Sequence, residues 1–80
     1  RAERARAAGD AAGALAALAE HRRRFPEGQL APEVAGTRAM VLCESGDARG
    51  APAGRAFLAR HGGTVLAGAV RRACAEADAP

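Results

Sequence analysis

The chain has 80 residues and a formal net charge of +3, which limits it to one small domain, and because it begins with Arg1 we expect a piece of a longer protein. Alanine is the commonest hydrophobic residue, and few β-branched or aromatic residues are present, so the composition predicts an all-α fold. The mild positive charge and the two Phe argue against a nucleic-acid-binding surface, and no apolar stretch approaches the roughly 20 residues that span a bilayer.

Turn signals divide the chain into five expected helices, at about 1–8, 11–24, 29–45, 48–61 and 65–77. The signals are Gly9-Asp10, Phe25-Pro26-Glu27-Gly28, Gly46-Asp47 and His61-Gly62-Gly63-Thr64. Asp10 is expected to cap the second helix, because a carboxylate accepts from the unpaired amides of a first helical turn. Pro26 then ends that helix.

The third helix carries apolar residues on two sides. One stripe contains Leu30, Val34, Thr37 and Val41, and the other contains Ala31, Ala35, Ala39 and Leu42. A helix with two apolar sides is expected to pack between neighbours. Pro32 is tolerated in its first turn, and Gly46 predicts a left-handed terminator.

The start of the fourth helix stays open between residue 48 and a late start near Ala51. Asp47 resembles a cap, but a helix beginning there would place Pro52 in its interior, at a cost of about 3 kcal/mol. Gly50 and Gly54 are small enough to let a partner helix approach closely. Thr64 is expected to cap the last helix.

The turn signals recur along the chain. Gly9-Asp10 returns as Gly46-Asp47, 37 residues later, and Phe25–Ala31 returns as His61–Ala67, 36 residues later. One period therefore holds two helices. Repeats of this length indicate stacked helical hairpins, in which neighbouring units complete each other's core.

Phe25-Pro26-Glu27-Gly28-Gln29-Leu30-Ala31, the Gly46-Asp47 turn, and Ala14 with Leu18 upstream of Pro26 resemble the tetratricopeptide repeat family. The variant that these residues resemble occurs in bacterial cell-envelope proteins such as the TolA-binding protein and outer-membrane assembly lipoproteins. The resemblance implies a single domain fragment over 1–80, built as a right-handed stack of antiparallel hairpins, an α-solenoid, with a C-terminal capping helix. It also suggests a periplasmic or cell-envelope location, with a cytoplasmic one still open.

The resemblance implies a non-catalytic scaffold that binds a protein or peptide, or adjoining repeats of the parent chain. The residues expected on its concave surface are Glu33, Thr37, Arg38 and Met40. The alternative is a purely structural C-terminal cap or spacer of a membrane-anchored regulatory or envelope protein, with no binding role of its own.

Two states are open for Cys43 and Cys74: buried free thiols, or a disulfide in an oxidising compartment. Counting by the 36-residue period, Cys74 lies level with Arg38, roughly 7.5 Å along the helix axis from Cys43. Since helix axes lie about 8 to 10 Å apart, the separation exceeds the usual Cα limit of about 7 Å. Free thiols are therefore the favoured state, although a tilted capping helix would allow the disulfide.

No catalytic, metal or cofactor site is expected. His21, His61 and the two cysteines form no close pair of the kind that zinc sites use, and no nucleophile and base share a recognisable arrangement. The arginines at 22–24, 60, 71 and 72 offer a grip for an acidic partner or for phosphates. Their position near helix C-termini, where cations complement the macrodipole, is the favoured explanation.

Overall fold

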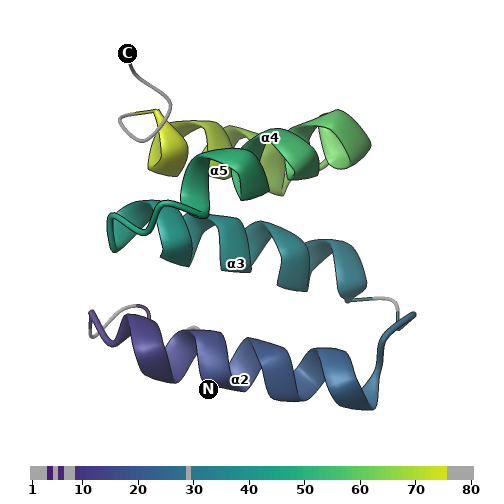
Figure 1. Cartoon of the computed structure of the whole chain (residues 1–80). Coiled ribbons are helices and arrows are strands. Elements are labelled where there is room, and N and C mark those ends of the chain that lie inside the picture. The colour runs from purple at the N-terminus through teal and green to yellow at the C-terminus, as the bar shows by residue number, and fades with distance from the viewer. Residues whose placement is uncertain (1–3, 5, 7–8, 29, 76–80) are drawn as a thin grey trace.

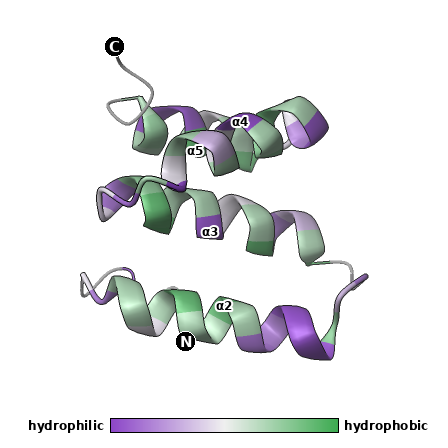
Figure 2. Cartoon of the chain, viewed as in Figure 1, coloured by the Kyte–Doolittle hydropathy of each residue, from purple (hydrophilic) through white to green (hydrophobic). Residues whose placement is uncertain are grey.

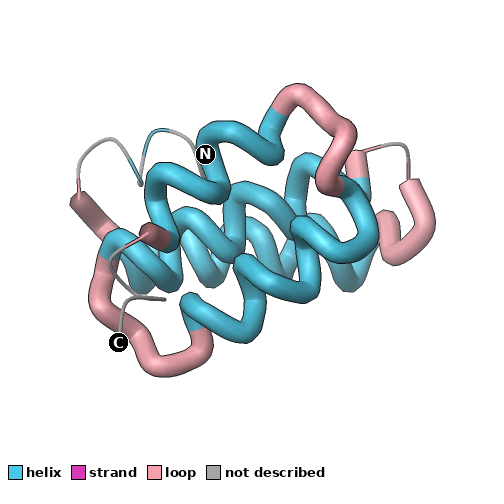
Figure 3. Tube along the Cα trace, turned by 90° about the horizontal axis from the view of Figure 1, so that it is seen from above, coloured by secondary structure: helices cyan, strands magenta, loops and turns pink. Residues whose placement is uncertain are grey.

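The computed structural model describes Arg4, Arg6 and residues 9–28 and 30–75, and this part of the chain is all-α, as the composition predicts (Figure 1). Its helices are α2 (Ala11–Arg24), α3 (Ala31–Glu44), α4 (Gly50–His61) and α5 (Leu66–Cys74). Figure 3 shows them joined by short loops, with no strand in the described residues. The expected helix over 1–8 lies outside the described residues, except for Arg4 and Arg6, which have helical backbone.

α3 is the central helix of a compact fold that measures 36 × 27 × 18 Å. Successive helices run antiparallel, with α2 on one side of α3 and with α4 and α5 together on the other (Figure 1). The prediction that α3 packs between neighbours is confirmed. Its buried residues are Val34, Gly36, Thr37, Ala39, Met40, Val41, Leu42 and Cys43.

Hydropathy follows this arrangement (Figure 2). Apolar residues dominate α3, whereas the C-terminal turns of α2 are strongly hydrophilic. α2 buries only Ala14 and Leu18, because it packs mainly on α3. The main core cluster lies on the other side of α3 and joins it to Phe57 of α4 and Val70 of α5.

Two helix ends form as the sequence predicts. The carboxylate of Asp10 accepts a hydrogen bond of 2.8 Å from the backbone N–H of Gly13, at the start of α2. After α3, Gly46 adopts a φ of 74°, the left-handed conformation that costs a glycine little.

α4 begins at Gly50, between the two starts that the sequence left open. Pro52 therefore lies in the first turn, where its missing N–H removes no helical hydrogen bond. Asp47 does not cap this helix. Its carboxylate instead accepts from the backbone N–H of Arg49 at 2.9 Å and from the Arg49 guanidinium at 2.8 Å. These bonds lower the pKa of Asp47 to about 2.

The last helix differs from its expected form at the start. Thr64 does not cap it, because its hydroxyl donates to the carbonyl of His61 at 2.8 Å. α5 begins at Leu66, after Val65, whose side chain is fully exposed to solvent. It ends at Cys74, and the expected continuation to 77 falls largely outside the described residues.

A disulfide joins Cys43 of α3 to Cys74 of α5, with their Cα atoms 5.0 Å apart. The favoured expectation of free thiols is therefore wrong. Its error lies in the register, because the two paired positions are 31 residues apart, five fewer than the repeat in the sequence. The disulfide sulfur of Cys74 also lies 3.7 Å from the carbonyl oxygen of Ala39, which is consistent with the same register.

Candidate functional site

Two of the surface grooves that border α3 are the candidate sites. The first lies between α2 and α3, has a volume of about 440 Å³ and is called here the Phe25 groove. The residues that line it are Ala17, Leu18, Glu20, His21, Arg24, Phe25, Leu30, Glu33, Val34 and Thr37. The turn after Pro26 brings its two walls together, because the chain reverses there between α2 and α3.

The Phe25 groove has an apolar floor and an exposed apolar rim. Leu18 and Val34 form the floor, with 6% and 8% of their surfaces exposed. Phe25 and Leu30 stand on the rim, with 54% and 48% exposed. Phe25 follows the last residue of α2, and its ring lies 5.2 Å from that of His21. Large apolar side chains left this open beside a groove mark a surface that suits an apolar partner group.

Charged side chains flank this apolar surface. Glu20 is paired with Arg23 and with Arg24, whose Nε lies 3.1 Å from the carboxylate. Glu33 stands in the first turn of α3, where a negative charge complements the helix dipole. The groove therefore combines a central apolar contact with polar groups around it.

The second groove, called here the arginine groove, lies between α2, α3 and α4 and has a volume of about 370 Å³. Its cationic or titratable side chains are Arg22 of α2, Arg38 of α3, and Arg60 and His61 of α4. Its remaining lining residues are Pro26, Ala31, Val34, Ala35, Ala53, Ala56 and Phe57. Among the described residues, none with an acidic side chain lines this groove.

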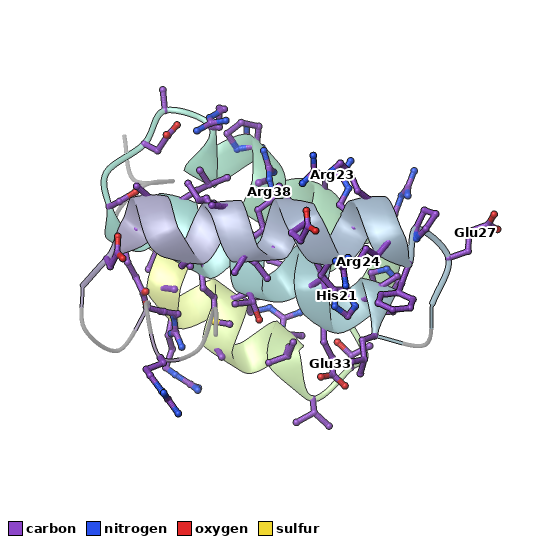
Figure 4. The ribbon with its side chains drawn as sticks, turned by 90° about the horizontal axis from the view of Figure 1, so that it is seen from below. His21, Arg23, Arg24, Glu27, Glu33 and Arg38 are labelled. Carbon is purple, nitrogen blue, oxygen red and sulfur yellow. A yellow bond between two sulfur atoms is a disulfide. The ribbon has the colours of Figure 1, made fainter. Side chains whose placement is uncertain are left out.

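The structure divides the four residues expected on a concave surface. Glu33 and Thr37 line the Phe25 groove, whereas Arg38 lines the arginine groove. Figure 4 shows Arg38 on one side of α2 and His21 with Glu33 on the other. Met40 is only 3% exposed and belongs to the core cluster, so the expectation that it faces a partner does not fit its position.

Phe25 and Leu30 were expected in apolar stripes, and their exposure was not predicted. The available signal was their position. Each flanks the Pro26–Gly28 turn, where the chain leaves one helix before it enters the next, and neither has a full helical turn of neighbours to cover it. Arg22, Arg38 and Arg60 lie on three different helices, and only the packing of α2 and α4 against α3 brings them to one groove.

The reactive side chains are engaged in structural contacts. His61 lies with its ring 5.3 Å from that of Phe57, in the same tilted arrangement as His21 on Phe25. Cys43 and Cys74 are bonded to each other. In the part of the chain that the structure describes, no three His, Cys, Asp or Glu residues converge in a way that would hold a metal ion.

None of the described helices is both long and apolar enough to cross a membrane. The described residues thus form a small four-helix domain with two surface grooves whose linings differ in charge. Comparisons with models of protein families, with curated proteins and with solved structures find no match for this chain.

Proposed function

We propose that this chain is a non-catalytic protein-interaction module and that the Phe25 groove receives an apolar side chain of a partner protein. The observation that carries the proposal is the exposure of Phe25 and Leu30, both about half open, above a floor of Leu18 and Val34. Covering such side chains removes apolar surface from water at roughly 25 cal/mol per Å². Buried aromatic and aliphatic anchors of this kind supply much of the free energy in protein interfaces.

The polar residues around the groove give the contact its orientation. Arg24, Glu33 and His21 lie at the edges, where a partner's polar groups remain near water. The Arg24–Glu20 ion pair lies on the α2 wall of the groove and Glu33 lies on the α3 wall, so the lining carries charges of both signs. A partner segment with a central Leu, Met or Phe and mixed charges on either side suits this arrangement.

We further propose that the module belongs to a stack of antiparallel hairpins of the tetratricopeptide kind. Three observations support this proposal. α3 and α4 form an antiparallel hairpin, α5 runs parallel to α3 and packs on it, and α3 is covered on both sides. The disulfide between Cys43 and Cys74 supports an oxidising compartment such as the bacterial cell envelope, because disulfides persist there.

The proposal is tested by placing a photo-crosslinking amino acid at Leu30 of the protein, within cells that make it. Leu30 is exposed and its side chain caps no helix, so the fold tolerates the change. We expect one dominant adduct, identified by mass spectrometry, that weakens when Phe25 is also changed to Ser.

The matched control carries the same amino acid at Ala16, which is exposed on α2 and lines neither groove. It should give no such adduct. Equal yields at Leu30 and Ala16, or none at either position, would contradict the proposal and favour the alternative of a structural cap or spacer.

A further inference from the structure

We infer that the arginine groove is a second binding site, on the opposite side of α2 from the Phe25 groove, and that it takes an acidic segment of a partner protein. The site joins guanidinium groups of three helices above an apolar floor. Its occupant is a stretch of chain in which Asp or Glu residues flank a small or medium apolar side chain.

The charge of this groove is unbalanced within the described part of the chain. Four arginines outside the groove have carboxylate partners, in the Arg6–Glu44, Arg23–Glu20, Arg24–Glu20 and Arg49–Asp47 pairs. By contrast, the described residues provide no ion pair for Arg22, Arg38 or Arg60. The carboxylate of Asp47 senses the charge of Arg38, but its hydrogen bonds go to Arg49.

Helix dipoles account for only part of this cluster. Arg22 and Arg60 lie in the last turns of α2 and α4, where cations are favourable. Arg38 is different because it lies in the middle of α3, eight residues into a helix of 14, and gains nothing from a helix end. A position in the arginine groove is what it shares with the other two arginines.

The floor of the groove suits a polypeptide. Ala35 and Ala56 are exposed and small, so a partner backbone can approach closely between the arginines. Phe57 lies below them at 3% exposure and gives the floor an apolar base. Guanidinium groups bind carboxylates through two parallel hydrogen bonds, which fixes both the position and the direction of an acidic segment.

This floor favours a peptide over phosphate or nucleic acid. Phosphate gains nothing from contact with an apolar surface. Single-stranded nucleic acid is bound through exposed aromatic rings on which its bases stack. The aromatic ring of Phe57 is buried, and no other phenylalanine lines the groove.

The test measures binding of fluorescent peptides to the oxidised chain by polarisation. One peptide of about a dozen residues places Leu between Glu residues, and its partner replaces each Glu with Gln. We expect the acidic peptide to bind about tenfold more tightly, a difference of about 1.4 kcal/mol. Raising the salt concentration should weaken this binding, because the pairs are exposed.

Two matched variants locate the site. R22Q/R60Q removes two charges from the arginine groove and should weaken binding of the acidic peptide about tenfold or more. R71Q/R72Q removes two charges from the exposed surface of α5 and should change the affinity for that peptide about twofold or less. All four arginines are solvent-exposed helix residues, so the melting curves of both variants should remain close to that of the unsubstituted chain. Phe25→Ser should leave binding of this peptide unchanged, which separates this inference from the proposed function.

Equal weakening by the two double variants would overturn the inference, because net charge alone would then explain the binding. Preference for the Gln peptide would do the same. So would displacement of the acidic peptide by inorganic phosphate or by a single-stranded oligonucleotide at lower concentrations than an unlabelled copy of the peptide requires.

Discussion

Individual glycines set how closely α4 approaches its neighbours. A Cβ atom added at Gly50 would lie 2.8 Å from the backbone nitrogen of Cys43, and one at Gly54 would lie 2.9 Å from the sulfur of Cys74. Both distances are below any real contact, and the first is to backbone, which cannot rotate away. Because Gly50 and Gly54 have no side chains, α4 lies directly against the disulfide. Larger residues at these two positions would push α4 outward.

Gly50→Ala is expected to destabilise the fold by about 1 to 3 kcal/mol, the usual cost of overpacking. The matched control is Gly68→Ala on α5, where the nearest atom to an added Cβ is the mobile end of Arg72 at 3.4 Å. This control should gain up to about 1 kcal/mol, because Ala is the better helix former. Thermal melts followed by circular dichroism compare the two, and a Gly50→Ala variant as stable as Gly68→Ala would show that α4 does not lie this close to α3.

At the scale of the element, α5 depends on its covalent link to α3. The helix has only nine residues, too short to be stable in isolation. It is held by burial of Ala67 and Val70 and by the bond between Cys74 and Cys43. Leu66 packs near the other end of α3, close to Gly36, so contacts at both ends fix its direction.

Reduction of the disulfide is expected to destabilise the fold by roughly 3 to 4 kcal/mol, from the chain entropy released in a loop closed over 31 residues. For a domain of this size each kcal/mol shifts the melting temperature by about 4 to 8 °C. Melting with and without reductant measures the loss. The Cys43→Ser/Cys74→Ser variant serves as the control, since reductant should have no further effect on it. Melting curves that coincide for the oxidised and reduced chains would contradict this expectation.

Sequence reasoning located the elements better than their mutual register. Turn chemistry is local, so Asp10, Pro26 and Gly46 identify helix ends without knowledge of the rest of the fold. The pairing of Cys43 with Cys74 depends instead on how far α5 slides along α3, which is decided by close contacts at Gly50, Gly54 and Gly36. The prediction that Thr64 caps the last helix was wrong for a similar reason. Its hydroxyl donates to the carbonyl of His61, in the turn before α5 begins.

The candidate site was predictable only in part. Glu33 and Thr37 were expected on one surface and both line the Phe25 groove, although Thr37 is buried, with only 6% of its surface exposed. Arg38 was expected on the same surface, but it lines the arginine groove. Adjacent residues of a helix point in different directions, so Thr37 and Arg38 lie on different sides of α3. Met40 follows the same rule, since its position on the helix turns it toward α4 and α5.

In the whole molecule, α3 is the common support of the fold. The large apolar side chains are few, and the two largest fully buried ones, Leu42 and Val70, lie on α3 and α5. No hairpin of the described residues encloses a core by itself, so α3 must hold α2 on one side and α4 with α5 on the other. Both grooves exist because α2 and α4 each cover only part of its surface.

Amide hydrogen exchange, resolved by residue, measures this directly in the oxidised chain. The account predicts that the slowest-exchanging amides lie in α3, from Thr37 to Cys43, and that α2 exchanges faster because it packs mainly on one neighbour. Slowest exchange in α2, or equally fast exchange in all four described helices, would contradict it.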